Sequence, residues 1–307
     1  IQYWKNKNDT KRTRIIALNN AYHGDTFGAM SISSRGIFTL AFQDRLFDVL
    51  FTDPPKEGKD IQFNGYAAEL TDQLLDETAC IIYEPLMQGA GGMLMYEPQA
   101  LEALLLRCKA HGIICIADEV MTGFGRTGKL FASSYCSTAP DIVCLSKGLT
   151  GGTMALGITA CIGTIHQAFV DDDKMKSLFH GHSFTANPIA CSAALASLDL
   201  LEKPSCAAGI ALIIAAHARF KSLLETDAAN LNIKNIRQLG TIIAFEVNDA
   251  ADSYFSQVRD RFTAEALQKG VYLRPLGNTV YLMPPYCITD DELQLTYSVI
   301  LDILRSR

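Results

Sequence analysis

The chain has 307 residues, of which 49% are hydrophobic, and it carries a formal net charge of −6. This length predicts two domains with a large apolar core. The mildly acidic balance, with no run of basic residues, argues against a nucleic-acid partner, and we identify neither an apolar stretch of membrane-spanning length nor a signal peptide at residues 1–14.

The first two hundred residues alternate short apolar runs with helical or polar segments. Strands are predicted at residues 14–18, 47–51, 78–83, 113–117, 142–145 and 157–162. Helices are predicted to end in residues 1–4, to begin at residue 27, and to span residues 61–76, 98–111 and 188–201. The apolar runs are rich in β-branched residues and bounded by turn signals, as is typical of parallel strands buried on both faces. We therefore predict a large α/β domain over residues 1–200.

The alternation ends at Lys203-Pro204, and a different order of elements follows. Helices are predicted at residues 210–225, 255–269 and 290–304, and strands at residues 233–239 and 241–247. Residues 271–273 and 279–283 are predicted to form a strand pair around the Gly277-Asn278 turn. This order predicts a smaller α+β domain over residues 201–307.

Two of the predicted buried strands are followed by ionisable residues. Asp118 follows residues 113–117, and Lys147 follows residues 142–145. Ligands of open α/β sheets bind at the carboxyl ends of the strands. Pyridoxal phosphate needs a lysine for its Schiff base and a carboxylate that keeps its pyridine nitrogen protonated, and a desolvated lysine is nucleophilic. We therefore predict a pyridoxal-phosphate site with Lys147 and Asp118 in these roles.

Each of these residues also has a simpler interpretation. Asp118 could instead cap the segment that follows it, and most lysines are solvated surface residues. Glu119 is adjacent to Asp118, but side chains alternate in direction along a strand, so we expect Glu119 to point elsewhere.

Other motifs are less specific. Tyr22-His23-Gly24 is typical of a turn with an ordinary aromatic residue, and the glycine-rich residues 88–92 are typical of a connector. His180 and His182 have no third ligand nearby in the sequence, which favours hydrogen bonding within a loop over a metal site. The nine cysteines lie mostly inside apolar runs without ligand spacing, so we expect free thiols in a reducing cytoplasm.

Six stretches of the sequence resemble the class III (subgroup II) aminotransferases, which are pyridoxal-phosphate enzymes of fold type I. They are YHGDTFGAMS (22–31), EPLMQGAGGMLMY (84–96), ADEVMTGFGRTGKLFA (117–132), CLSKGLTGGTMAL (144–156), HGHSFTANPIAC (180–191) and RPLGNTVYLMPPY (274–286). The resemblance covers essentially the whole chain. It implies a large domain with a mostly parallel sheet flanked by helices, a smaller C-terminal domain, and pyridoxal 5′-phosphate as the cofactor.

The resemblance also implies which residues hold the cofactor. Lys147 resembles the Schiff-base lysine, and Asp118 resembles the partner of the pyridinium nitrogen. Tyr22 resembles the aromatic residue that stacks on the cofactor ring, and Glu84 lies beside the cofactor in the family. Ser183 matches a hydroxyl that binds the cofactor phosphate of the other subunit, which implies a homodimer with a shared active site.

A second set of residues resembles the substrate pocket of the family. Tyr22, Asp25 and Gly181 match positions that line this pocket. Arg274 matches the arginine that pairs with the carboxylate of the keto substrate, and its planar fork suits bidentate recognition of a carboxylate. Without the resemblance, Arg274 would equally well be a surface arginine before a proline.

Within the family, the stretches 22–31, 144–156 and 274–286 are most similar to the members that form 7,8-diaminononanoate in biotin synthesis. This implies 8-amino-7-oxononanoate as the amino acceptor and S-adenosylmethionine as the donor, although some relatives use lysine. Met121 stands where ornithine and 4-aminobutyrate aminotransferases carry glutamine, which favours the biotin enzymes. Another ω-amino acid aminotransferase, a decarboxylase or racemase of the same fold, and a non-catalytic relative remain alternatives.

The family has a further N-terminal part before the point where this sequence begins. That part includes a Ser-Gly turn that binds the cofactor phosphate. We therefore expect the natural protein to be longer than this chain.

Overall fold

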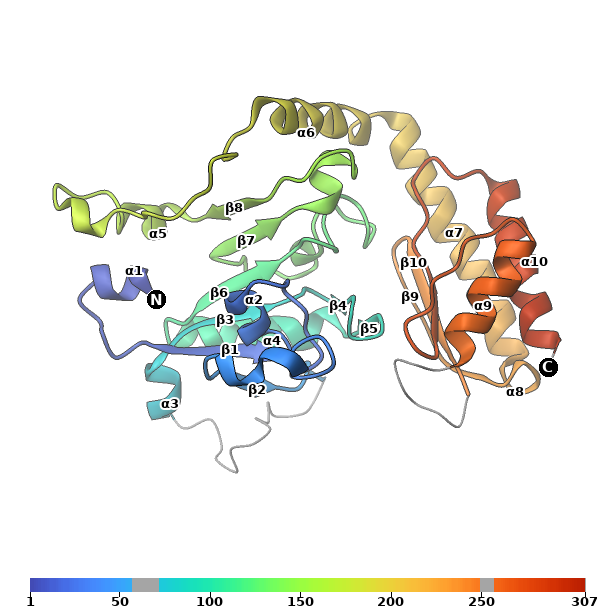
Figure 1. The fold of residues 1–307 in the computed structure, drawn as a ribbon, viewed down its shortest axis with the longest axis horizontal. Helices are drawn as coiled ribbons and strands as arrows, with labels where there is room; N and C mark the ends of the chain where they lie inside the picture. Colours follow the sequence, from blue (N-terminus) through green and yellow to red (C-terminus); the bar gives the residue numbers. More distant parts are fainter. Residues whose placement is uncertain (57–71, 249–256, 307) are drawn as a thin grey trace. The chain divides into compact units, whose positions relative to one another are not determined.

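The computed structural model describes residues 1–56, 72–248 and 257–306 of the chain. The chain divides into two compact units (Figure 1): the first comprises residues 1–122 and 132–197, and the second comprises residues 123–131 and 198–307. The short segment 123–131 therefore packs with the second unit, which the sequence analysis did not anticipate. The two domains predicted to meet near residue 200 stay a prediction.

A six-stranded sheet is the centre of the first unit. Its strand order is β2-β1-β3-β6-β7-β8. The strands are β1 Arg14–Leu18, β2 Leu50–Thr52, β3 Thr78–Tyr83, β6 Ile114–Asp118, β7 Ile142–Leu145 and β8 Ile158–Cys161. All neighbours pair in parallel except β7 and β8, which are antiparallel. The mostly parallel sheet predicted from the apolar runs is therefore confirmed. The prediction that its strands are buried on both faces is wrong for β7, which is half-buried, and for β8, which is exposed.

Strand β2 is shorter than predicted, because it begins at Leu50 and not at residue 47. The backbone of Phe47 bonds to side chains instead of a neighbouring strand. Its N–H donates to Ser31 Oγ at 3.2 Å, and its carbonyl accepts from Arg35 Nη2 at 3.1 Å. A backbone satisfied in this way has no need of a ladder partner.

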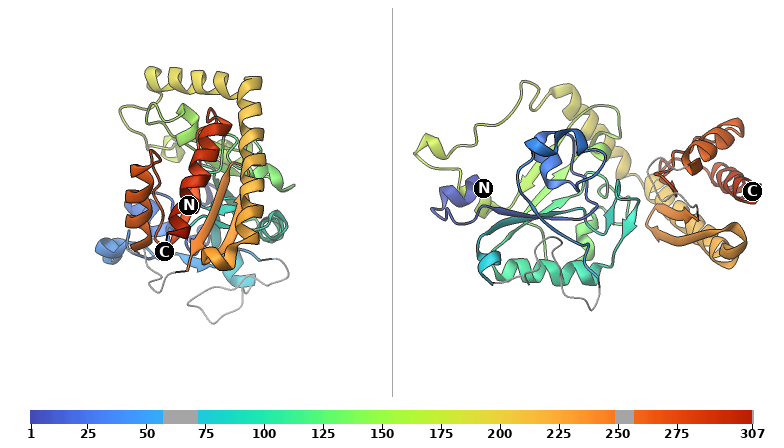
Figure 2. Two further views of the ribbon diagram at one scale, coloured as in Figure 1. Left: turned by 90° about the vertical axis from the view of Figure 1, so that its right-hand side faces the viewer. Right: turned by 60° about the horizontal axis from the view of Figure 1, so that its bottom comes forward.

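Helix α4 (Pro98–Ala110) packs against β6 and shows why this segment is helical. Pro98 occupies the first turn, where its missing N–H costs nothing. The buried side chains Leu101, Leu104, Leu105 and Cys108 recur at helical spacing. Figures 1 and 2 show α4 and α2 (Phe27–Ile32) on opposite faces of the sheet.

The other described elements that begin in the first unit are short, except α6, whose last residues belong to the second unit. They are α1 Gln2–Asn6, η1 Leu40–Arg45, α3 Asp72–Asp76, β4 Met87–Gln88, β5 Leu94–Met95, η2 Ala132–Tyr135, η3 Lys147–Thr150, α5 Gly163–Gln167, η4 Lys174–Lys176 and α6 Pro188–Leu201. Of the helix predicted at residues 61–76, the part before residue 72 lies outside the described residues. The same holds for the first residues of the helix predicted at 255–269.

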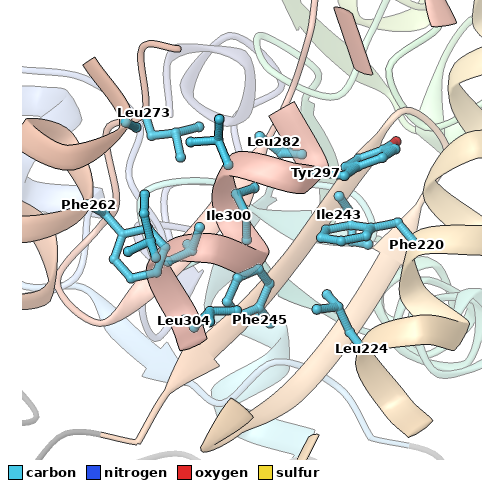
Figure 3. Packing of buried hydrophobic residues seen from close by; sticks show 14 of the residues in the cluster. Phe220, Leu224, Ile243, Phe245, Phe262, Leu273, Leu282, Tyr297, Ile300 and Leu304 are labelled. Atoms are coloured by element: carbon cyan, nitrogen blue, oxygen red, sulfur yellow. The ribbon is translucent and has the colours of Figure 1, made fainter. Parts of the chain in front are cut away.

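The second unit packs helices on a three-stranded antiparallel sheet. The sheet order is β11-β10-β9, with β9 Ile233–Leu239, β10 Ile242–Val247 and β11 Thr279–Leu282. Its helices are α7 Pro204–Thr226, α8 Ala228–Leu231, α9 Gln257–Gln268 and α10 Asp290–Arg305. Figure 3 shows Phe245, Phe262 and Ile300 packed in the core between them. Helix α10 begins with a capping box between Thr289 and Glu292.

The strand pair predicted at residues 271–273 and 279–283 is wrong. Only the second segment forms a strand, and it pairs with β10. Pro275 has no N–H to donate to a ladder, and the carbonyl of Leu273 accepts from Thr263 Oγ1 at 3.0 Å. Val271 and Leu273 contribute buried side chains to the core instead.

Helix α7 corrects the statement that no stretch reaches membrane-spanning length. Among the described residues, it is the one helix long and apolar enough to cross a membrane. Its residues Ile213, Ala216, Phe220 and Leu224 are buried in the core of the second unit. Because they recur at helical spacing against the sheet, we interpret α7 as a core helix.

Truncating Phe262 tests this core. Phe262 is 1% exposed on α9, whereas Leu267 on the same helix is 60% exposed. We expect Phe262→Ala to lower the free energy of unfolding by about 3–5 kcal/mol, because it loses apolar burial and leaves a cavity. The control Leu267→Ala should change it by less than about 0.5 kcal/mol. Urea titration of both variants measures the difference, and equal losses would contradict this packing.

Candidate active site

The first unit brings Asp118 and Lys147 to neighbouring strand ends. Asp118 is the last residue of β6, and it lies in register with Cys144 on the parallel strand β7. Lys147 begins η3 two residues after β7 ends. Its backbone is in the left-handed region, with φ of 45°, a strained conformation that is frequent in active sites. The predicted meeting of these residues at one sheet edge follows from the parallel pairing.

The side chain of Lys147 differs from the expectation. The sequence analysis expected a desolvated lysine, but Lys147 is exposed among the described residues. Its main chain is nevertheless fixed, because Ser146 Oγ donates to Leu156 O at 2.6 Å and Ser197 Oγ donates to Gly148 O at 3.0 Å. The fold therefore fixes the backbone position of Lys147 and leaves its side chain exposed.

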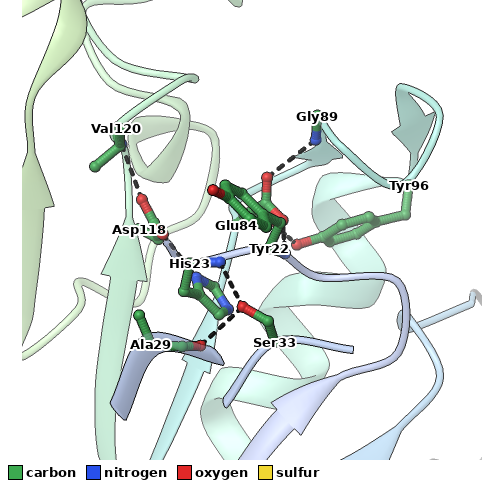
Figure 4. Close-up of polar contacts among 9 residues, drawn as sticks. All are labelled: Tyr22, His23, Ala29, Ser33, Glu84, Gly89, Tyr96, Asp118 and Val120. Carbon is green, nitrogen blue, oxygen red and sulfur yellow. Dashed lines mark hydrogen bonds and ion pairs between the residues drawn. The ribbon is translucent and has the colours of Figure 1, made fainter. Parts of the chain in front are cut away.

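Asp118 is a buried carboxylate with one donor on each oxygen. Its Oδ1 accepts from the N–H of Val120 at 3.1 Å, and its Oδ2 lies 2.6 Å from Nδ1 of His23. The contact with Val120 is the local cap that the simpler interpretation of Asp118 predicts. The contact with His23 comes from the loop after β1 and was not predicted (Figure 4).

His23 is the residue that sequence reasoning missed. It lies between Tyr22, which was identified, and Gly24, whose φ of 124° few other residues adopt. Its side chain is 2% exposed, and its Nε2 has no hydrogen-bond partner among the described residues. The sequence offered one indication of His23, its position next to Tyr22 in the motif of residues 22–31.

Glu84 is a second buried acid, placed directly after β3. Its oxygens accept from the N–H of Tyr22 at 3.1 Å and from the N–H of Gly89 at 2.9 Å (Figure 4). Its carbonyl accepts from the hydroxyl of Tyr96. Burial outweighs these two donors and raises the pKa of Glu84 from 4.5 to about 7. The structure therefore brings the predicted residues Glu84 and Tyr22 into contact.

Glu119 points away from Asp118, as the alternation along a strand predicted. It is fully buried, and four donors surround it. Its Oε2 accepts from Thr122 Oγ1 at 2.6 Å and Ala132 N at 3.0 Å, and its Oε1 accepts from the N–H of Ser133 at 2.7 Å and from its hydroxyl at 2.6 Å. Glu119 thereby joins the residues on either side of the segment 123–131.

A cavity of about 200 Å³ opens beside Tyr22, and Asp25 and Phe38 also line it. Burial, followed by a hydrogen bond to Asp25, raises the pKa of Tyr22 to about 12. The phenol therefore stays protonated as a donor at neutral pH. This places the predicted pocket residue Asp25 next to Tyr22.

Among the described residues, no contact within a unit connects the remaining predicted residues to this sheet edge. Gly181 and Ser183 lie in an exposed loop of the first unit. Arg274 is an exposed residue of the second unit, between the buried residues Leu273 and Pro275. Among the described residues, no group of three or more histidine, cysteine or acidic side chains could hold a metal ion.

The arrangement fits pyridoxal phosphate. A buried carboxylate whose two oxygens are each fixed by one N–H is suited to hold a ring nitrogen protonated. An accessible lysine amine follows the next strand. Tyr22 offers an aromatic face on the loop that also carries the partner of this carboxylate.

Comparisons with known proteins agree with this chemistry. A family model described as "Aminotransferase class-III" matches residues 1–304. The adenosylmethionine-8-amino-7-oxononanoate aminotransferase of Synechococcus elongatus is 43% identical, over 99% of this chain and 72% of the relative. The protein of the same name from Helicobacter pylori is 36% identical, over 97% of this chain and 69% of the relative.

Two solved structures also match almost the whole chain. The structure of adenosylmethionine-8-amino-7-oxononanoate aminotransferase from Methanocaldococcus jannaschii is 31% identical with a TM-score of 0.86, over 99% of this chain and 70% of that one. An amine transaminase from an uncultivated Pseudomonas species, solved in its PLP-bound form, is 29% identical with a TM-score of 0.84, over 99% and 72%.

The raised pKa of Glu84 predicts a pH dependence of stability. Between pH 4.5 and about pH 7, the folded chain keeps a proton on Glu84 that the unfolded chain releases. The free energy of unfolding therefore falls as pH rises through this window, by roughly 3 kcal/mol from this residue. Glu84→Gln should remove this part of the slope in urea titrations, and the exposed control Glu97→Gln should keep it. Equal slopes for Glu84→Gln and the unmodified chain would contradict the prediction.

Proposed function

Because the chain belongs to the class-III aminotransferases, whose cofactor is pyridoxal phosphate, we propose that it transfers an amino group to 8-amino-7-oxononanoate. The product would be 7,8-diaminononanoate, an intermediate in biotin synthesis. We propose S-adenosylmethionine as the donor. The observation that carries this proposal is the identity of 43% and 36%, over 99% and 97% of this chain, to two relatives whose names state this donor and acceptor.

The buried polar groups of the first unit have roles that suit this reaction. When bound, pyridoxal phosphate supplies an electron sink for the carbon that carries the amino group. The Asp118 carboxylate would keep the ring nitrogen protonated, because an adjacent negative charge favours the pyridinium form. Tyr22 would offer its aromatic face to the ring. Glu84 would lie at the same edge, where its raised pKa lets it carry a proton near neutral pH.

Lys147 would act twice. Its Nζ would hold the cofactor covalently and, once released, would remove the proton from the amino-bearing carbon and return a proton as general base and acid. This role is supported by the defined backbone position of Lys147, which has a strained conformation and lies next to a fixed residue.

Four residues are proposed to recognise the substrates: Tyr22, Asp25, Gly181 and Arg274. In the first unit, Tyr22 and Asp25 line the cavity, and Gly181 would add a backbone contact. In the second unit, the exposed guanidinium of Arg274 would bind the carboxylate of the keto acid, because its planar fork matches two carboxylate oxygens.

We also propose that the protein works as a homodimer in the cytoplasm. Exposed apolar side chains gather in the sequence around the loop that carries Ser183, including Leu178, Phe179, Phe184 and Ile189. Apolar surface of this kind is typical of a protein interface, and Ser183 would then serve the cofactor phosphate of the partner subunit. All nine cysteines are free, which supports a reducing compartment.

A panel of donors and acceptors tests the proposed function. With 8-amino-7-oxononanoate as acceptor, S-adenosylmethionine should support product formation, whereas lysine, ornithine and 4-aminobutyrate should not. Lys147→Ala should abolish turnover and the borohydride-reducible link to the cofactor, and the exposed control Lys234→Ala should retain both. Turnover with lysine alone would replace the donor. Faster turnover with ω-amino acids and other acceptors would favour an amine transaminase, the name of a 29% identical relative.

Arg274→Ala tests recognition of the acceptor carboxylate. The loss of a charge-assisted pair costs about 1.5–3 kcal/mol, so KM for the keto acid should rise about 10-fold to 150-fold. KM for the amino donor should change little. Arg274→Lys keeps the charge without the planar fork, and we expect an intermediate KM. Equal rises for donor and acceptor would count against this role, and steady-state kinetics of both substrates decide between the outcomes.

A further inference from the structure

The loop after β1 carries a buried histidine aimed at the carboxylate of Asp118. We propose that His23 is a positioning residue for Asp118: its imidazole N–H fixes the carboxylate in the orientation that holds the ring nitrogen of the cofactor. This inference rests on the role proposed for Asp118 in the previous subsection. It adds to that role a second residue that does not itself touch the cofactor.

The contact between the two side chains is short and enclosed. His23 Nδ1 lies 2.6 Å from Asp118 Oδ2, and the two side chains are 2% and 10% exposed. An ionised carboxylate can only accept a hydrogen bond, so Nδ1 carries the hydrogen. A hydrogen bond to an ionised group is roughly twice as strong as a neutral one, and a low local dielectric strengthens it further.

The imidazole is held from its main chain as well. The N–H of His23 donates to Ser33 Oγ at 2.9 Å, and Ser33 Oγ donates to the carbonyl of Ala29 at 2.8 Å (Figure 4). The preceding residue, Tyr22, is fixed through its N–H by Glu84. These bonds connect the loop after β1 to α2 and to the end of β3, so the position of the ring is set by elements that do not include Asp118.

The second ring nitrogen of His23 supports this role, because it makes no competing hydrogen bond to a described residue. Nε2 is buried and has no partner among the described residues, so the contact with Asp118 is the one side-chain hydrogen bond recorded for this imidazole. Burying a polar ring costs free energy unless it is bonded. The hydrogen bond from Nδ1 to the carboxylate of Asp118 therefore accounts for a buried histidine at this position.

The consequence concerns both oxygens of Asp118. Val120 holds Oδ1 from the same strand end, and His23 holds Oδ2 from another loop. Two donors on different oxygens fix the plane of the carboxylate, whereas the Val120 contact alone leaves rotation about the bond to the carboxyl group free. Supporting hydrogen bonds of this kind keep a functional group in its productive orientation.

Three substitutions at His23 separate positioning from general packing. An asparagine places its amide nitrogen near the position of Nδ1, so His23→Asn keeps the donor to Asp118. A glutamine places its amide nitrogen near the position of Nε2, so His23→Gln is a polar control without that donor. His23→Leu removes all polarity. His166, an exposed histidine in α5, supplies the control His166→Asn.

The first readout is the affinity of the full chain for pyridoxal phosphate, measured from the absorbance of the bound cofactor. His23→Leu and His23→Gln should raise the dissociation constant about tenfold or more, as expected for one hydrogen bond to a charged group. His23→Asn and His166→Asn should stay close to the unmodified chain. In steady-state kinetics, His23→Leu and His23→Gln should lower kcat while KM for the acceptor changes little.

Equal affinities of the asparagine and glutamine variants would overturn the proposal, whether or not the leucine variant folds. Unchanged cofactor affinity in His23→Leu would do the same. The affinity measurement needs no substrate. If the proposed acceptor or donor is wrong, the unmodified chain will show no turnover, but His23→Leu and His23→Gln will still bind the cofactor more weakly than His23→Asn. A chain that binds no pyridoxal phosphate at all would overturn both proposals.

Discussion

The buried carboxylate of Asp118 is the interaction on which the candidate site depends. A charge removed from water must find donors within the protein, and this one receives them from its own strand end and from the loop after β1. That requirement joins two segments that are far apart in the sequence. The strand order β1-β3-β6-β7 places the carboxyl ends of four parallel strands in sequence along one edge. A residue of the site lies at or shortly after each of these ends, as expected for ligand sites of open α/β sheets.

Three acids near this edge differ in how many donors surround them. Glu119 has four donors, Asp118 has two, and Glu84 has two, both from the backbone. For Glu84, burial outweighs the donors, so its pKa rises to about 7. A carboxyl group therefore serves as a structural connector in Glu119, as an oriented acceptor in Asp118 and as a group that can carry a proton in Glu84, according to its surroundings.

The family and the site support different parts of the functional conclusion. Membership of the class-III aminotransferases gives the reaction type and the cofactor. The geometry of the first unit supports roles for Asp118, Tyr22 and Glu84, because each is fixed by named contacts. The residues proposed to select the substrates include Asp25 and Arg274, whose side chains are exposed.

The sequence by itself determined most of the elements and two of the chemical groups. Strands such as β3 and β7 were predicted with their observed bounds, because each is a short apolar run bounded by turn signals. Asp118 and Lys147 could be found because an ionisable residue at the end of such a strand is unusual. Only the tertiary structure identified His23, showed that β11 pairs with β10, and placed residues 123–131 in the second unit. These features depend on contacts between distant segments, and local periodicity carries no information about which distant group a side chain meets.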